Sequence, residues 1–231
     1  MFIKVLGASG YTRWKSQFAR KFTSCWFKID NRTFQIDVGN PPEREIDYLI
    51  ISHTHYDHFQ HIGKVRPGTV VLLPDKSFFE PMEKKNPSLM GVFIDGLWTY
   101  ANFKIEPFKV LHSSTSETYG FKLFFGKKKV VWLTDYFIVP NLEVNLRKTD
   151  VLFLGASAMK KDILHRGYGH GQLCIWKMLQ KISKLKDKPK KIYLIHFGSA
   201  LRPLKIKIPY IQRNFPSLNI DWAWDDRLIQ I

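Results

Sequence analysis

Four apolar segments of the chain each end on a histidine or an aspartate, and this recurrence constrains the fold more than any other feature. We interpret the segments as β-strands because Val, Ile, Leu and Tyr follow one another in short runs. They are "DYLIISH" ending at His53, "FKVLH" ending at His112, "VVWLTD" ending at Asp135 and "KIYLIH" ending at His196. Because α/β sheets build their sites at the carboxyl ends of strands, we expect the four side chains to converge.

The first segment runs into "HTHYDH", residues 53–58, which holds three of the eight histidines of the chain. Imidazole and carboxylate groups are the ligands that zinc and similar divalent ions take. Residues two apart in an extended segment point to the same side, so His53 and His55 can hold one ion while Asp57 and His58 turn towards a second. His112 and His196 complete the two sets, and Asp135 bridges them. The predicted metal ligands are His53, His55, Asp57, His58, His112, Asp135 and His196.

The order of elements predicts one α/β domain over residues 1–231, because strands occur in runs with helices between them in each half. With 45% hydrophobic residues, the chain can bury a sizeable core. The expected strands lie near residues 2–8, 25–30, 32–38, 47–52, 69–73, 92–94, 97–110, 119–125, 129–134, 150–154, 191–195 and 220–230. The expected helices are 58–64, 76–85, 141–147, 171–186 and 204–214, of which 171–186 has the clearest apolar stripe.

The net charge of +16 and a pI of about 9.8 favour anionic partners such as nucleic acid, nucleotides or phosphorylated metabolites. A lysine-rich solvated surface explains the same charge, and the sequence leaves both interpretations open. Cys25 and Cys174 have no metal-ligand spacing, and we expect two buried apolar side chains. No signal peptide or long apolar run is visible, so a cytoplasmic protein with no membrane partner is expected.

The order of these motifs resembles the metallo-β-lactamase superfamily. The resemblance rests on "HTHYDH" at 53–58, "LHSS" at 111–114, "LTD" at 133–135 and "IHFG" at 195–198, with "TFQIDVG" at 33–39 as an early strand. It implies an αββα sandwich of two mixed sheets, with helices on the outer faces and a dinuclear metal site at one edge. In the family, such sites activate a water for hydrolysis.

Two further segments narrow the resemblance. The stretch "GYGHGQ", residues 167–172, looks like a motif of the tRNase Z and cyclic-phosphodiesterase branch, where the extra histidine, here His170, assists at the scissile phosphate. A turn residue or helix cap is the alternative for this histidine. Residues 7–26 occupy the place of that branch's Gly-rich loop, and Arg13, Trp14 and Lys15 are candidates for contacts with phosphates and bases. An amphipathic surface segment is the alternative there, and the chain lacks a long insertion like the substrate-clamping arm of tRNase Z.

The sequence thus predicts a dinuclear metal-dependent hydrolase, in the first place a phosphodiesterase. Its expected substrate is a nucleotide or a nucleic-acid-like phosphodiester, with RNA among the candidates. Asp57 is expected to orient the attacking water or accept its proton, and His170 to assist the leaving oxygen. Zinc is the expected ion, with manganese or iron as alternatives. The alternative functions are hydrolysis of a lactone, thioester or β-lactam, and nucleic-acid binding with a structural metal site. His61 is expected beside the site or on the surface, and His165 has no predicted role.

Overall fold

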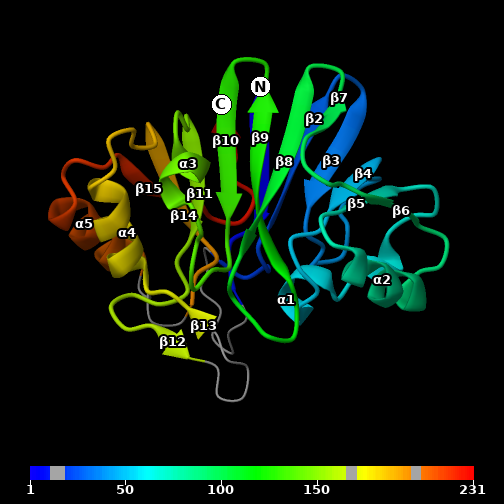
Figure 1. Ribbon diagram of the computed structural model, residues 1–231, viewed down its shortest axis with the longest axis horizontal. Helices are drawn as coiled ribbons and strands as arrows, with labels where there is room; N and C mark the ends of the chain where they lie inside the picture. The colour runs from blue at the N-terminus through cyan, green and yellow to red at the C-terminus, as the bar shows by residue number, and fades with distance from the viewer. Residues whose placement is uncertain (11–18, 165–170, 199–203) are drawn as a thin grey trace.

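The computed structural model describes residues 1–10, 19–164, 171–198 and 204–231. Two seven-stranded mixed sheets pack against each other, and helices lie on the outer sides (Figure 1), which confirms the predicted fold class. The strands are β1 Phe2–Gly7, β2 Ser24–Ile29, β3 Arg32–Ile36, β4 Tyr48–Ile50, β5 Val70–Leu73, β6 Met90–Phe93, β7 Trp98–Tyr100, β8 Phe103–Val110, β9 Thr118–Phe125, β10 Lys128–Leu133, β11 Val151–Gly155, β12 Ile163–Leu164, β13 Gly171–Gln172, β14 Lys191–Ile195, β15 Ile220–Trp222 and β16 Leu228–Gln230. The helices are α1 Tyr56–Phe59, α2 Phe79–Lys85, α3 Leu142–Leu146, α4 Ile175–Ser183 and α5 Leu204–Asn214, with short 3-10 turns η1 Ile62–Lys64 and η2 Lys76–Phe78.

The two sheets have similar layouts, and this positions the site. The first has the order β16-β1-β2-β3-β4-β5-β6, with β3 to β6 parallel. The second has the order β15-β14-β11-β10-β9-β8-β7, with β10, β11, β14 and β15 parallel. The carboxyl ends of the parallel strands of both sheets meet at the lower edge in Figure 1, beside α1 and β13. That edge receives the predicted ligands.

The main core lies between the sheets and is rich in aromatic side chains. Phe103 of the second sheet lies 5.3 Å from Phe27 and 5.2 Å from Phe34 of the first, measured between ring centroids. A second apolar cluster joins the first sheet to α1 and α2, with Phe59 and Met82 as helix members. Both clusters exclude water from the strands that end at the site, so those ends are held in fixed positions.

Helix α4 is shorter than the sequence predicts. Its buried stripe includes Leu179 and Ile182, as the spacing of apolar residues indicates. The predicted start at residue 171 is wrong, because Gly171 and Gln172 pair with β12 as strand β13. The N–H of Leu173 also donates to the carbonyl of Tyr136, so helical hydrogen bonding begins only after Cys174.

Other predicted elements are also divided in the structure, including helix 76–85, which is η2 followed by α2. The expected strand 97–110 is the hairpin β7–β8, because Ala101 adopts a positive φ of 50° in the turn. The expected strand 220–230 forms β15 and β16 in different sheets, with Asp226 at a φ of 65° in the connection. The expected helix 58–64 is α1 followed by η1.

Cys25 and Cys174 are free and buried, as expected for small apolar side chains. Among the helices of the described ranges, none combines the length and apolar character needed to cross a bilayer.

Candidate metal centre

The predicted ligands lie shortly after strands, on the short helix α1, or, for His55, at the N-cap of α1. His53 follows β4 by three residues, and Asp57 and His58 lie on α1 immediately beyond it. His112, Asp135 and His196 follow β8, β10 and β14 within two residues. All of these six residues are at most 6% exposed, whereas His55 is half-buried. A rigid sheet edge therefore brings seven imidazole and carboxylate side chains to one small volume.

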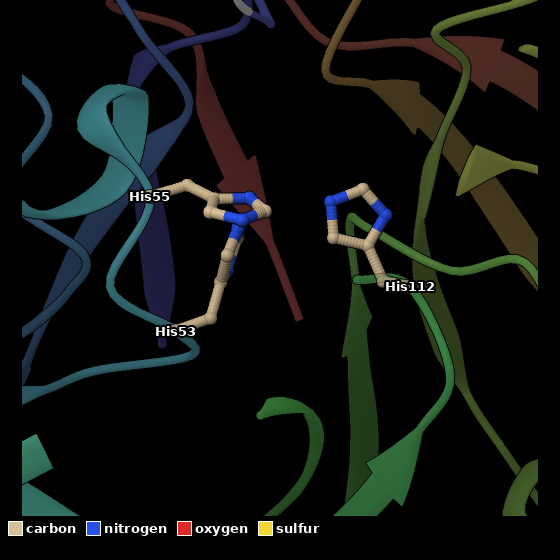
Figure 2. Close-up of side chains that lie close together, drawn as sticks. All are labelled: His53, His55 and His112. Atoms are coloured by element: carbon tan, nitrogen blue, oxygen red, sulfur yellow. The ribbon is translucent and has the colours of Figure 1, made fainter. Parts of the chain in front are cut away.

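The side chains fall into two groups with an overlapping third. Ligand atoms of His53, His55 and His112 lie within 4.8 Å of one another, and so do those of Asp57, His58 and His196. A third group of the same compactness joins His53, His58 and Asp135. Figure 2 shows His53 and His55 side by side on one chain segment, with the ring of His112 facing them from the end of β8. The structure thus assembles the two predicted sets, with Asp135 between them.

Each buried histidine is held through its Nδ1 atom. His58 Nδ1 lies 2.7 Å from Asp37 Oδ2, and His112 Nδ1 lies 2.9 Å from the carbonyl of Gly171. The Nδ1 atom of His53 lies 3.0 Å from Ser52 Oγ, and that of His196 lies 3.1 Å from Ser157 Oγ. The four Nδ1 partners are thus Asp37 Oδ2, Gly171 O, Ser52 Oγ and Ser157 Oγ. A partner that accepts a hydrogen bond from Nδ1–H keeps the proton on that nitrogen and leaves the Nε2 lone pair for a metal.

The Nε2 atoms and the carboxylates face one another across the centre. His58 Nε2 lies 3.0 Å from Asp135 Oδ2 and 3.3 Å from His196 Nε2. His196 Nε2 lies 3.2 Å from Asp57 Oδ2. His53 Nε2 is buried and has no hydrogen-bond partner among the described residues. Buried polar atoms are nearly always satisfied, so a cluster of facing acceptors with an unpaired nitrogen fits divalent cations.

The electrostatics differ between the two groups. Burial lowers the pKa of His53 well below its usual value, lowers the pKa of His55 to about 4, and lowers the pKa of His112. These three rings are therefore neutral at physiological pH, as metal ligands must be. Burial also opposes charge on His58, but the carboxylates of Asp57, Asp37 and Asp135 hold the pKa of His58 well above the usual range. A divalent cation would take the place of that proton.

The structure also brings in residues that the sequence analysis did not select. Asp37 follows β3 as the predicted ligands follow their strands, so this signal was present in the sequence. Gln172 donates through Nε2 to Asp135 Oδ1, which leaves Oδ2 of that carboxylate towards His58. Gly10 lies so near His196 that an added Cβ would be 3.0 Å from the imidazole. The first loop therefore begins at the wall of the site.

Other predicted site residues lie elsewhere or outside the described ranges. His61 is half-buried between α1 and η1 and belongs to none of the three groups. Four predicted site residues lie outside the described ranges: the catalytic candidate His170 and the substrate-binding candidates Arg13, Trp14 and Lys15. His165, which has no predicted role, lies outside them too.

The sequence matches the family model described as the β-lactamase superfamily domain over residues 25–197. The match covers most of the chain and includes all seven predicted ligands, and the chain belongs to this superfamily. The fold and the His/Asp cluster are those of a metal-dependent hydrolase. A search of curated proteins returned no match.

Solved structures of several metallo-β-lactamase-fold proteins are similar over the whole chain. A diphosphatase from the PhnP family has a TM-score of 0.76 at 20% identity, with 100% of this chain and 97% of that chain covered. Zn²⁺-bound PqqB from Methylobacterium extorquens has a TM-score of 0.76 at 12% identity, with both chains fully covered. The short form of human tRNase Z has a TM-score of 0.66 at 14% identity, with 100% and 99% covered. At these identities the similarity establishes the fold.

Proposed function

We propose that the protein is a dinuclear metal-dependent phosphodiesterase that acts on a nucleotide or a nucleic-acid-like substrate. The observation that carries the proposal is the arrangement of seven ligands in two compact groups that share one sheet edge. Asp135 lies within 3.6 Å of both His112 Nε2 and His58 Nε2, one from each group. A carboxylate in that position is suited to bridge two ions.

Zinc is the ion that we propose for both positions, because five histidines and two carboxylates form a ligand set that zinc accepts. Manganese and iron remain the alternatives for such ligands. The first position would be held by His53, His55 and His112, and the second by Asp57, His58 and His196. The similarity to Zn²⁺-bound PqqB supports the choice of zinc.

The residues of the chain would divide the catalytic work as follows. When bound, the two ions supply Lewis acidity to an attacking water and to the phosphoryl oxygens. Asp57, with Oδ2 only 3.2 Å from His196 Nε2, is a buried member of the second group, where it orients that water and accepts its proton. His170 donates a proton to the leaving oxygen or stabilises the charge that develops there. Arg13, Trp14 and Lys15 follow Gly10, which borders His196, and we assign them contacts with substrate phosphate and base.

Two observations favour a phosphodiester over another hydrolysable bond. The net charge of +16 draws anionic molecules towards the protein as a whole, which favours an anionic substrate over an uncharged lactone or thioester. The fold is similar to that of a diphosphatase and of a tRNase Z, two proteins whose names state phosphate chemistry. Hydrolysis of a lactone, thioester or β-lactam is the second candidate, because the same ligand set would serve it.

The test is hydrolysis of bis-p-nitrophenyl phosphate by the purified protein loaded with zinc or manganese, beside a His170→Ala variant. We expect turnover that requires the metal and falls by about 100-fold or more in the variant. Absence of turnover with either metal, together with hydrolysis of lactone or thioester substrates, would replace the proposal by the second candidate. Metal-independent nucleic-acid binding without any turnover would instead support a binding protein with a structural metal.

A further inference from the structure

Half of the net charge of the protein is concentrated in three short connections. We define the basic edge as residues 127–129, 147–150 and 184–191. These segments hold ten lysine and arginine residues and two aspartates, Asp150 and Asp187. The excess of eight positive charges compares with +16 for the whole chain. The charge is therefore not spread evenly over a solvated surface.

The basic edge lies at the opposite end of the second sheet from the metal centre. Its segments lead into the parallel strands β10, β11 and β14, whose carboxyl ends carry or adjoin the metal ligands. In Figure 1 the β9–β10 turn is at the upper edge, whereas α1 is at the lower edge. At about 3.3 Å per residue, the five residues from Lys191 to His196 span about 17 Å. An anion at the basic edge thus does not occupy the catalytic site.

Most positive charges of the basic edge are not neutralised. Asp150 lies 2.8 Å from Lys190 and 3.9 Å from Lys128, Asp187 lies 3.7 Å from Arg147, and Asp221 lies 3.8 Å from Lys191. The other six of the ten basic residues have no such pair among the described residues. No carboxylate among the described residues pairs with Lys127, Lys148 or Lys186, and all three side chains are exposed. Like charges held close together repel each other, so their clustering costs stability unless an anion compensates it.

The shape of the basic edge fits a chain of phosphates. Lys127, Lys148 and Lys186 come from three different connections and line one shallow hollow of about 520 Å³. Neighbouring strands lie about 4.8 Å apart, so three adjacent strands spread these connections over about 10 Å before the side chains extend. Connections spread over this distance suit several phosphates of one backbone better than a single phosphate, and Asp150 and Asp187 in the same lining leave the lysines in excess. None of the large exposed apolar side chains of the described residues falls within the three segments, so the surface offers nothing to insert into a bilayer.

We infer that the basic edge is a second, non-catalytic docking surface, which binds the sugar–phosphate backbone of a nucleic acid without reading its sequence. Lys127, Lys148 and Lys186 are its main contacts, and each neutralises a backbone phosphate. The binding needs no metal, because no metal ligand lies on this edge. It is also independent of the proposed catalytic activity, since a nucleic acid can dock here whatever bond the metal centre hydrolyses.

The test is the affinity of the full chain for a fluorescent single-stranded RNA oligonucleotide, measured by anisotropy over a series of salt concentrations with EDTA present. The variant carries Lys127→Glu, Lys148→Glu and Lys186→Glu. The control carries Lys64→Glu, Lys76→Glu and Lys84→Glu, three exposed lysines on η1, η2 and α2, and has the same net charge. We expect the variant to bind at least about tenfold more weakly, with a salt slope reduced by about 2 for three lost contacts. The control should stay close to the wild type.

Each other outcome overturns the inference. Equal losses in the two variants would show that net charge alone drives binding, and unchanged binding in the first variant would remove the basic edge from the interaction. Loss of all binding on addition of EDTA would move the nucleic acid to the metal centre. Binding to anionic vesicles but not to RNA would replace nucleic acid by a membrane surface. Hydrolysis of bis-p-nitrophenyl phosphate, measured in parallel, tests the proposed function separately, because the three lysines lie far from the metal centre.

Discussion

His58 and Asp37 form a fully buried contact, with 2.7 Å between Nδ1 of the histidine and Oδ2 of the aspartate. Asp37 also accepts the backbone N–H and the hydroxyl of Ser52, each at 2.8 Å. Through the same hydroxyl, Ser52 contacts His53 Nδ1. One carboxylate thus orients two of the proposed ligands, one from each group.

Replacing Asp37 by Asn tests this arrangement. The residue has a φ of 57°, which Asn tolerates, so the fold is expected to survive. Loss of the charge that orients His58 should weaken zinc binding by about 10- to 100-fold. A competitive titration of zinc against a fluorescent chelator measures the change. The exposed Asp95→Asn variant serves as control, and an Asp37→Asn affinity equal to that of the control would contradict the role given to Asp37.

The convergence of the predicted ligands on one sheet edge could be foreseen because most of them follow strands. An apolar run that ends on His or Asp is a local signal, and the runs ending at His53, His112, Asp135 and His196 are indeed strand ends or lie within three residues of one. The convergence of these ends follows from parallel strands that share an edge. Asp37 gives the same signal after β3. It was not selected because the sequence analysis used "TFQIDVG" only as an early strand of the family and assigned it no ligand.

The parts that the sequence did not predict depend on contacts between distant residues. Ser157 and Gln172 contact His196 and Asp135 across 39 and 37 positions, and neither residue type signals such a partner. After β15 the chain crosses from the second sheet to the first, where β16 pairs with β1 and places Leu228 beside Lys4. No local pattern distinguishes β16 from β15, because both are short apolar runs. Tertiary pairing decides their sheets.

Replacing Asp57 by Ala should abolish phosphodiester turnover while the fold survives. The side chain is a buried member of the second group, where it contacts His196 and its helix neighbour His58. Removing a proton acceptor of this kind is expected to reduce kcat by about 100-fold or more. Rates with saturating zinc, beside circular dichroism of both proteins, provide the measurement. Full activity of Asp57→Ala would contradict the mechanism, and Glu80→Ala on the exposed side of α2 is the control.

Replacing Gly39 by Ala should destabilise the protein through the backbone of the ligand segment. A Cβ at this position would lie 1.8 Å from the carbonyl oxygen of Asp57. That backbone cannot yield freely, because the neighbouring carbonyl of His58 accepts the N–H of Val38 at 2.7 Å. We expect a loss of about 1–3 kcal/mol or more in the free energy of unfolding, measured by urea denaturation.

The matched control for this variant is Gly63→Ala in η1. There the nearest atom to an added Cβ is the carbonyl oxygen of Lys85 at 3.3 Å, so a small adjustment suffices. A loss in Gly39→Ala no larger than in Gly63→Ala would show that the ligand segment adapts, and that the close approach of the two backbones does not constrain it.

Asp162 should make a pH-dependent contribution to stability, because its carboxylate contacts Cys174 and Lys177 at the start of α4. Its Oδ1 accepts a hydrogen bond from the N–H of Cys174 at 2.9 Å, and its Oδ2 accepts one from Lys177 Nζ at 2.6 Å. Burial opposes the charge of Asp162, but the hydrogen bonds from Lys177 and Cys174 outweigh it and lower its pKa. A lowered pKa in the folded state means that this stabilisation is present above about pH 4, the pKa of an unfolded aspartate, and is lost as the pH falls through the folded pKa.

The Asp162→Asn variant should therefore unfold at lower urea concentration than the wild type at pH 7, and the difference should shrink as the pH is lowered towards 3. The effect is expected to be modest because solvent screens the exposed Lys177. The Asp95→Asn variant, which changes an exposed side chain, should follow the wild type at both pH values. A difference between Asp162→Asn and wild type that grows on acidification would mean that the carboxylate destabilises the fold, and that its contacts with Cys174 and Lys177 do not compensate for its burial.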